Sequence, residues 1–166
     1  MCPNFSNTLF FQCMREFEAP NVTTVELTQY GFYIERTAKR IKQYMQRKFT
    51  AANFGITVDQ WVILDVLNTH DGLSQFEIAE KTYKDAPTVT RIIDLLCKKG
   101  FTKREIDGKD RRRFKIFLTA NGRKKIEEVL PVVKECREVG WSELNDSDYS
   151  QLLRIMDTIF GNFAER

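Results

Sequence analysis

The chain has 166 residues, of which 42% are apolar and 30% are charged, and this composition is typical of one globular domain rather than of a disordered chain. The net charge of +3 is too small to indicate a nucleic-acid-binding protein, and no apolar run approaches the roughly 18 residues of a membrane-spanning helix. The charge is, however, unevenly distributed, because residues 91–125 carry 13 Lys/Arg and 4 Asp/Glu, a net +9. This asymmetry predicts a focused polyanion-binding surface.

The sequence favours a cytoplasmic protein with reduced thiols and without a metal or cofactor. The first charged residue is Arg15, so the N-terminus lacks the basic region of a signal peptide. The single histidine, His70, follows a predicted helix at a turn. The four cysteines lie far apart without a CxxC pair, which argues against a zinc site: Cys2, Cys13, Cys97 and Cys136.

The first elements are an aromatic segment of unknown role over residues 1–27 and two helices. Over residues 28–49, apolar residues recur every three or four positions, from Tyr30 to Met45, which predicts an amphipathic helix. Thr57 is a favourable N-cap for a second helix over residues 58–68. His70-Asp71-Gly72 then predicts a turn.

Two more helices follow closely. Ser74-Gln75-Phe76-Glu77 has the capping-box pattern and opens a short helix that ends near Thr82. The next helix is expected over residues 86–99, with Pro87 in its first turn and Gly100 as its stop.

After Gly100 the apolar period changes from that of a helix to that of a strand. Residues 101–106 and 113–118 are predicted strands, joined by a polar hairpin loop that contains Gly108. Thr119 caps a further helix, which we expect to be interrupted or kinked near Pro131. Asn145 and Asp146 cap a last helix to Phe163, so the predicted class is mainly α with a small β-hairpin (α+β).

The helix over residues 86–99 has two different faces. Its apolar residues cluster on one side and leave an outer face of small, hydroxylated or basic residues, with the two threonines on its flanks, as a helix that enters a DNA groove requires: Pro87, Thr88, Thr90, Arg91 and Lys98. Asp94 is an exception on this face, because it would repel phosphate unless it held Arg91 three residues away.

The hairpin that follows carries five cations within seven residues: Lys109, Arg111, Arg112, Arg113 and Lys115. Like charges packed on a turn repel each other, and a polyanionic partner would offset this repulsion. The arrangement therefore favours a polyanion-binding role. Arginine suits a narrow minor groove, where the negative potential is enhanced. A basic hairpin directly after a helix-turn-helix pattern is more specific than either feature alone.

Several segments resemble the MarR (multiple antibiotic resistance regulator) family of winged-helix transcription factors. The most specific part is Asp110-Arg111-Arg112 followed by Leu118-Thr119-Ala120-Asn121-Gly122. Other matching segments run in family order over about residues 28–165: Thr57-Val58-Asp59-Gln60-Trp61-Val62-Ile63-Leu64, Gly72-Leu73-Ser74-Gln75-Phe76-Glu77-Ile78-Ala79, Pro87-Thr88-Val89-Thr90-Arg91-Ile92-Ile93, Lys99-Gly100-Phe101-Thr102-Lys103-Arg104 and Asp107-Gly108-Lys109.

The resemblance implies a cytoplasmic homodimer that binds double-stranded DNA at a pseudo-palindromic operator, most often as a repressor. Residues 28–56 and 124–166 would supply dimerisation helices, and residues 57–123 a winged helix-turn-helix domain. Its recognition helix would be residues 86–99, and its wing tip Asp110, Arg111 and Arg112, with Arg112 inserted into the minor groove. The first turn of the preceding helix would contact phosphates through Ser74 and Gln75.

The resemblance also implies release by a small aromatic effector or an oxidant. Tyr30, Tyr33 and Trp61 are candidates to line an effector pocket, although aromatic residues at helical spacing also fit a core. Cys97 and Cys136 fit structural thiols better than a redox switch, since a sensor thiol needs exposure and a lowered pKa.

The sequence disfavours two other classes of function. A winged-helix module that binds protein instead of DNA is compatible with Asp85 and Asp94, but the basic hairpin disfavours it. An enzyme is disfavoured because the sequence has no GxSxG, HExxH, GxGxxG or P-loop pattern.

Overall fold

The computed structural model describes residues 29–108 and 113–163 and divides the chain into two compact units, residues 1–39 and 40–166. The division falls within the first described helix, α2 (Tyr30–Ala51), and each unit is described by itself. In the first unit, the rings of Phe32 and Tyr33 meet edge to face at 5.8 Å. The Arg36 guanidinium lies 4.7 Å from the centre of the Tyr33 ring, a cation–π distance.

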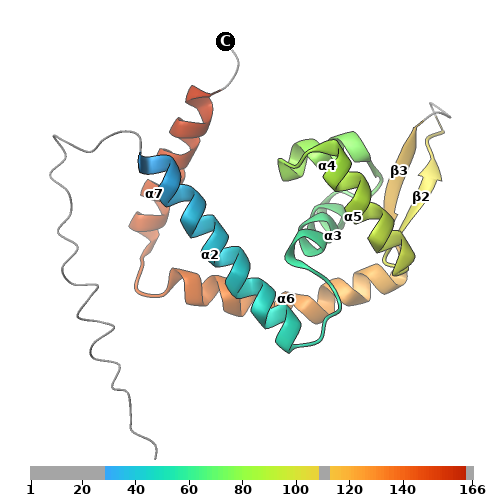
Figure 1. Cartoon of the computed structure of the whole chain (residues 1–166), viewed down its shortest axis with the longest axis horizontal. Helices are drawn as coiled ribbons and strands as arrows, with labels where there is room; N and C mark the ends of the chain where they lie inside the picture. Colours follow the sequence, from blue (N-terminus) through green and yellow to red (C-terminus); the bar gives the residue numbers. More distant parts are fainter. Residues whose placement is uncertain (1–28, 109–112, 164–166) are drawn as a thin grey trace, which may run out of the picture. The chain divides into compact units, whose positions relative to one another are not determined.

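The second unit contains the helices α3 (Val58–Thr69), α4 (Gln75–Thr82) and α5 (Ala86–Lys98), which Figure 1 shows beside a β-hairpin. Two longer helices follow the hairpin, α6 (Ala120–Trp141) and α7 (Asp146–Asn162). The fold is mainly helical with a small sheet, as the sequence predicts. None of the described helices has the length and apolar character that a membrane span requires.

Local capping fixes where the helices begin. Thr57, Ser74 and Asn145 each cap a helix through a complete capping box, in which the cap side chain and the third helical residue exchange hydrogen bonds with each other's backbone. Asp85 caps α5, and Thr119 caps α6. These caps confirm the predicted starts at Thr57, Ser74, Thr119 and Asn145.

The sheet has one strand more than the sequence indicates. The predicted hairpin is present as β2 (Thr102–Ile106) and β3 (Phe114–Leu118), with Ile106 opposite Phe114. The additional strand, β1 (Leu73–Ser74), pairs antiparallel with the other edge of β3, which gives the order β1-β3-β2. A two-residue strand has no apolar alternation of its own, so only its pairing with β3 reveals it.

The sequence predicts an interruption or a kink near Pro131. The interruption is wrong, because α6 continues unbroken from Ala120 to Trp141, while the kink stays a prediction. Pro131 lies on the exposed side of this helix, where water can solvate the carbonyl group that loses its donor. On the other side, Val129 and Val133 are fully buried, and their burial favours continuation of the helix through the proline.

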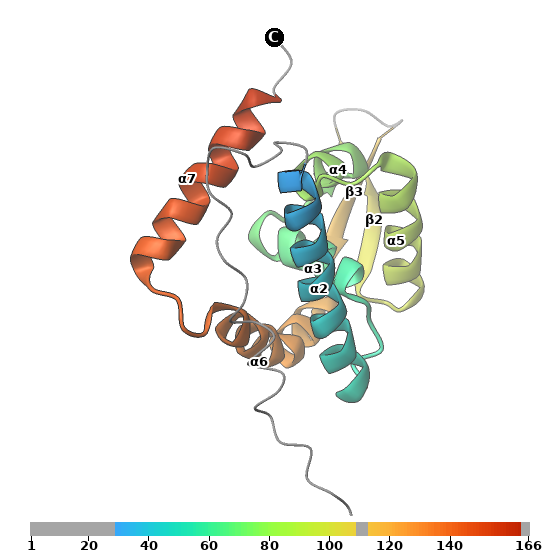
Figure 2. The ribbon, with the colours of Figure 1, turned by 60° about the vertical axis from the view of Figure 1, so that its left-hand side comes forward.

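The core of this unit joins the C-terminal end of α2, α3, α4, α5, the sheet and α6. Its fully buried side chains come from all of these elements: Phe49, Ile63, Leu64, Leu67, Ile78, Val89, Ile93, Leu96, Ile116, Val129 and Val133. Phe49 also contacts the rings of Phe54 and Trp61 edge to face, at 5.5 and 6.5 Å. The core therefore fixes α5 against α3, while Figure 2 shows α5 lying alongside the hairpin.

Candidate nucleic-acid interface

The outer face of α5 is the first part of the candidate interface. Val89, Ile92, Ile93 and Leu96 are buried in the core, as the helical spacing predicts. Pro87, Arg91 and Lys98 are exposed on the outer side, whereas Thr88 and Thr90 are half-buried. This division leaves a helix whose outer side chains are available to a large partner.

Thr90 contributes less to that face than the sequence indicates. Its hydroxyl donates to the carbonyl of Ala86 at 3.0 Å and lies 3.4 Å from Oε1 of Gln75. Gln75 is half-buried at the start of α4. These two predicted DNA-contacting residues therefore contact each other and link α4 to α5.

Asp94 forms a different ion pair from the one expected. Its Oδ1 lies 2.7 Å from Nη1 of Arg104 in β2, instead of pairing with Arg91. The side chains retain 45% and 32% of their exposure, so the pair is only partly screened by water. Arg104 thereby compensates the one acidic residue on the outer side of α5 and joins that helix to the hairpin.

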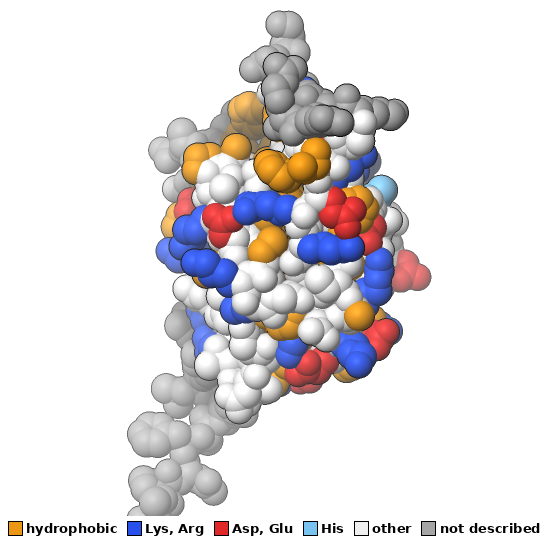
Figure 3. Space-filling view, turned by 90° about the vertical axis from the view of Figure 1, so that its right-hand side faces the viewer, with side chains coloured by type: hydrophobic (Ala, Val, Ile, Leu, Met, Phe, Trp, Pro, Cys, Tyr) orange, Lys and Arg blue, Asp and Glu red, His pale blue; other side chains and the backbone are white. Residues whose placement is uncertain are grey.

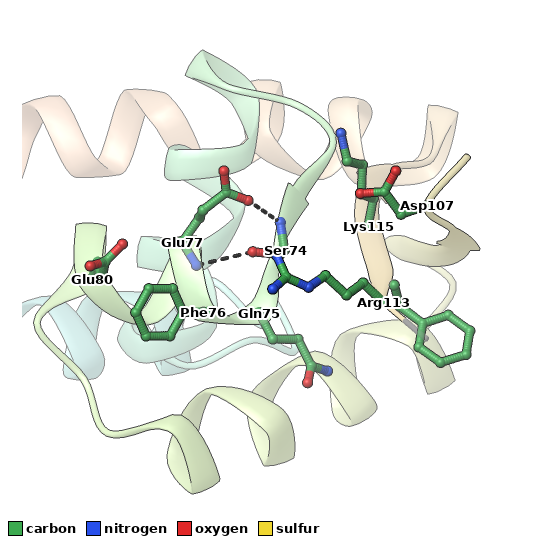
Figure 4. A pocket seen from close by; sticks show the side chains of 9 residues that line it. Ser74, Gln75, Phe76, Glu77, Glu80, Asp107, Arg113 and Lys115 are labelled. Carbon is green, nitrogen blue, oxygen red and sulfur yellow. Dashed lines mark hydrogen bonds between the residues drawn. The ribbon is translucent and has the colours of Figure 1, made fainter. Parts of the chain in front are cut away.

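The second part of the interface is a groove of about 730 Å³ between the start of α4 and the hairpin. It is lined by Ser74, Gln75, Phe76, Glu77, Glu80, Asp107, Arg113, Phe114 and Lys115. Figure 4 shows the Arg113 side chain extending from the hairpin towards the start of α4. The pairing of β1 with β3 forms this groove, because it sets Ser74 opposite Lys115.

The hydroxyl of Ser74 is already engaged at the groove wall. It accepts a hydrogen bond from the Glu77 backbone at 3.2 Å, while the Glu77 carboxylate accepts from the Ser74 backbone at 2.7 Å (Figure 4). The hydrogen bonds from Ser74 lower the pKa of Glu77, with a smaller contribution from the nearby cations Lys115 and Lys81. The capping box thus holds the first turn of α4 in place while keeping an ionised carboxylate in the groove.

Apolar side chains also line this region, and the sequence reading missed them. Phe76 is 68% exposed and Phe114 is 49% exposed, with Ile106 opposite Phe114 in the hairpin. The strand period puts Phe114 on the same face as Ile116 and Leu118, which are buried, yet Phe114 itself is half exposed. A strand pattern predicts which face of a strand is buried, but it does not say which end of the strand extends beyond the core. The exposure of these aromatic residues beside cations could therefore not be predicted from the pattern.

The charge around the interface is mixed. On the side of the molecule shown in Figure 3, Lys and Arg side chains are spread among acidic and apolar ones. The cations predicted at the hairpin tip, Lys109, Arg111 and Arg112, lie outside the described residues, together with Asp110. Arg113, next to them, is exposed.

The predicted effector residues occupy different settings. Tyr30 is 41% exposed and Tyr33 is half-buried, both in the first described turns of α2. Trp61 is only 2% exposed and packs in the core against Phe49.

Neither of the described cysteines is exposed. Burial raises the pKa of Cys136, as does the adjacent Glu135 carboxylate, and a raised pKa lowers the thiolate fraction. Cys97 is half-buried, with its Sγ 3.3 Å from the Thr102 hydroxyl. Cys2 and Cys13 lie outside the described residues.

Three short helices, α3 to α5, are followed by a hairpin that belongs to the three-stranded sheet. This arrangement defines a winged helix-turn-helix. Comparison with known proteins agrees. A model described as the MarR family matches residues 54–113. The uncharacterised HTH-type transcriptional regulator YwoH of Bacillus subtilis is 33% identical over 105 residues, which cover 61% of this chain and 76% of that protein.

Two further relatives match over more of the chain. The HTH-type transcriptional repressor NicR of Pseudomonas putida is 24% identical over 128 residues, which cover 77% of this chain and 80% of the relative. A crystal structure of the S. aureus MepR–DNA complex has a TM-score of 0.73 at 26% identity and covers 83% of this chain and 99% of the other. The chain belongs to the MarR family, and it is a transcriptional regulator rather than an enzyme.

Proposed function

We propose that this regulator binds double-stranded DNA sequence-specifically through α5 and the hairpin, as a dimeric repressor on a pseudo-palindromic operator. The observation that carries the proposal is the outer face of α5, where Pro87, Arg91 and Lys98 are exposed while the apolar side is buried. Arginine pairs bidentately with guanine in the major groove, and lysine binds phosphate as a point charge. The DNA complex of the similar MepR supports this assignment.

The hairpin and the first turn of α4 complete the proposed interface. Arg113 and Lys115 line the groove opposite Ser74 and Gln75, so cations and helix-end amide groups meet at one place. A DNA backbone that passes along α5 would meet both. Residues 57–123 form the DNA-binding part in this proposal, and Lys109, Asp110, Arg111 and Arg112 are assigned to the wing tip from the sequence.

A homodimer is proposed because α7 has no buried residue among those described. The large apolar side chains of α7 and its C-cap residue are exposed to between 37% and 73%: Leu152, Leu153, Ile155, Met156, Phe160 and Phe163. A continuous apolar stripe on a helix is stable in water only when another surface covers it. We therefore assign residues 28–56 and 124–166 to dimerisation, which also supplies the two-fold symmetry of a pseudo-palindromic site.

The experiment is a fluorescence-anisotropy titration of a labelled duplex taken from upstream of the gene. Arg91→Ala should weaken binding by about 1–3 kcal/mol, the scale of a specific base contact. Arg137→Ala, which removes an exposed arginine from α6, is the matched control and should bind like the wild type. A plot of log K against log salt should fall steeply, because each protomer neutralises several phosphates.

The same titration distinguishes a DNA-binding regulator from the alternative function, a protein-interaction module. A wild-type protein that binds upstream DNA no more tightly than a scrambled duplex, with a shallow salt dependence, would favour a protein-interaction module and contradict the proposal. Arg112→Ala tests the wing tip in the same way, since an unchanged titration would remove Arg112 from the interface.

For the release signal, we propose a small aromatic acid in preference to an oxidant. Tyr33 stacks under the Arg36 guanidinium in the first unit, so an aromatic ring and a cation are already adjacent there. The raised pKa of Cys136 argues against oxidation of that thiol as the release signal. Benzoate-type acids or peroxide are added to the preformed protein–DNA complex to test the two signals. The proposal requires that the acid release the DNA and that peroxide not release it.

A further inference from the structure

The recognition helix α5 is attached to α3 at both of its ends by lysines. At its C-terminal end, Nζ of Lys99 donates to Oε1 of Gln60 at 3.0 Å and to the carbonyl of Gly55 at 2.6 Å. Gln60 is 4% exposed, and its Oε1 also accepts from the Thr57 backbone at 3.2 Å. The buried amide is therefore held in one orientation by the cap of α3.

The N-terminal end of α5 is attached to Asp59, the residue that precedes Gln60 in α3. Lys84 lies in the connection between α4 and α5, next to the Asp85 cap, and its Nζ is 2.7 Å from Oδ1 of Asp59. Both side chains are partly buried, at 21% and 30% exposure. The carboxylate of Asp59 also pairs with Lys42 of α2 at 2.7 Å.

We propose that Asp59 and Gln60 are positioning residues for DNA reading, because they fix the two ends of the recognition helix through Lys84 and Lys99. This inference rests on the proposed function of α5. We call the four residues Asp59, Gln60, Lys84 and Lys99 the α5 anchor. None of them belongs to the DNA-contacting residues proposed above.

The physical reason lies in the kinds of contact that α5 makes. Its buried face consists of Val89, Ile92, Ile93 and Leu96, and hydrophobic burial holds a helix down without strong directionality. Charge-assisted hydrogen bonds are short and directional, so anchoring at both ends fixes the tilt and rotation of the helix. A base contact such as that of Arg91 needs its side chain placed to within a fraction of an ångström, and the anchor supplies that placement.

The sharpest test is Asp59→Asn, which removes a negative charge without removing a cation. If Lys84 served DNA as a phosphate contact for which Asp59 competes, this variant would bind DNA more tightly. If Asp59 positions α5, the variant binds the operator about three- to tenfold more weakly, the range for a coupling through a network. It should also lose discrimination against a scrambled duplex while its salt slope stays unchanged, because no phosphate contact is lost.

Lys84→Met should reproduce that loss of discrimination with the same salt slope, and Lys99→Met should do so at the other end of the helix. Lys42→Met is the matched control, because it removes a cation from the same carboxylate without touching α5. Its operator affinity should remain within about twofold of the wild type. Equal losses in Lys42→Met and Lys84→Met, or a reduced salt slope in Lys84→Met, would overturn the anchor.

A readout without DNA keeps this proposal separate from the proposed function. Backbone amides of α5 should exchange with deuterium faster in Asp59→Asn than in Asp65→Asn, which makes the same charge change on the same helix. Failure of the wild type to bind DNA would end the proposed function, yet faster exchange would still support the anchor. Unchanged exchange together with unchanged discrimination would refute it.

Discussion

The guanidinium of Arg104 in β2 lies 2.7 Å from the carboxylate of Asp94 in α5. The pair joins the hairpin to the outer side of α5 and neutralises the one acid on that face. The partners are ten residues apart, and helical spacing instead pointed to Arg91. If α5 binds DNA as proposed, Arg104 should influence that binding through Asp94, without a DNA contact of its own.

Arg104→Ala should weaken DNA binding by about 1 kcal/mol, because it leaves Asp94 uncompensated beside phosphate. In an Asp94→Asn background, the same substitution should cost measurably less, and Asp94→Asn alone should bind at least as well as the wild type. A double-mutant cycle on operator DNA measures this coupling. Additive losses would mean that Arg104 acts by a contact of its own.

Ser74→Ala should lower the free energy of unfolding by about 1 kcal/mol, the usual cost of losing an N-cap. Its hydroxyl satisfies the Glu77 backbone donor at the start of α4. Urea denaturation monitored by circular dichroism measures the change. Ser150→Ala, at an exposed site inside α7, is the control and should stay within about 0.5 kcal/mol of the wild type.

Gly122→Ala should destabilise the fold by about 1–3 kcal/mol, since an added Cβ would overlap the carbonyl oxygen of Phe101. That carbonyl accepts the Thr119 backbone donor at the start of α6, so it cannot move away without breaking this bond. Gly140→Ala provides the comparison in the same helix, because no atom lies within 4 Å of its Cβ position. The latter should be neutral or stabilising by up to about 1 kcal/mol, and equal melting temperatures for the two variants would refute the steric argument.

The pH dependence of stability should report on Asp59. Burial raises the pKa of this carboxyl, but hydrogen bonds from Lys42 and Lys84 outweigh burial, so its pKa is lowered in the folded state. A lowered folded pKa means that the carboxylate stabilises the fold above the ordinary Asp value of about 3.9, and that this contribution disappears as the pH falls through the folded value.

The wild type should therefore exceed Asp59→Asn in unfolding free energy by about 1 kcal/mol near neutral pH. The difference should shrink as the pH falls below about 4. Urea titrations of both proteins from pH 7 to pH 2.5 measure it, with Asp65→Asn as the background for a charge change on α3. A difference that grows towards low pH would have the wrong sign for this ion pair.

Ile155→Glu should convert the protein from a dimer to a monomer in sedimentation at micromolar concentration. Ile155 is 45% exposed on the apolar stripe of α7, and a carboxylate there cannot be buried against a partner without a large desolvation cost. Arg154→Gln, on the side of the helix opposite the stripe, should leave the dimer intact. A wild-type monomer would remove the symmetry on which the pseudo-palindromic operator depends.

The sequence by itself determined the features that depend on near neighbours. The caps at Thr57, Ser74 and Asn145, the apolar face of α5 and the strand period of the hairpin each follow from residues within about four positions of one another, so local physics suffices to find them. The family resemblance rests on the same local segments, and the comparisons confirm it.

Only the tertiary structure decided the contacts that bring distant residues together. β1 exists because Leu73 and Ser74 pair with β3, and this pairing sets Ser74 opposite Lys115 to form the groove. Lys84 meets Asp59, 25 residues away, and Lys99 meets the Gly55 carbonyl, 44 residues away. A lysine in a sequence has no preferred partner until burial of the core selects which carboxylate or carbonyl lies within its reach. For that reason the orientation of α5 could not be read from the chain alone.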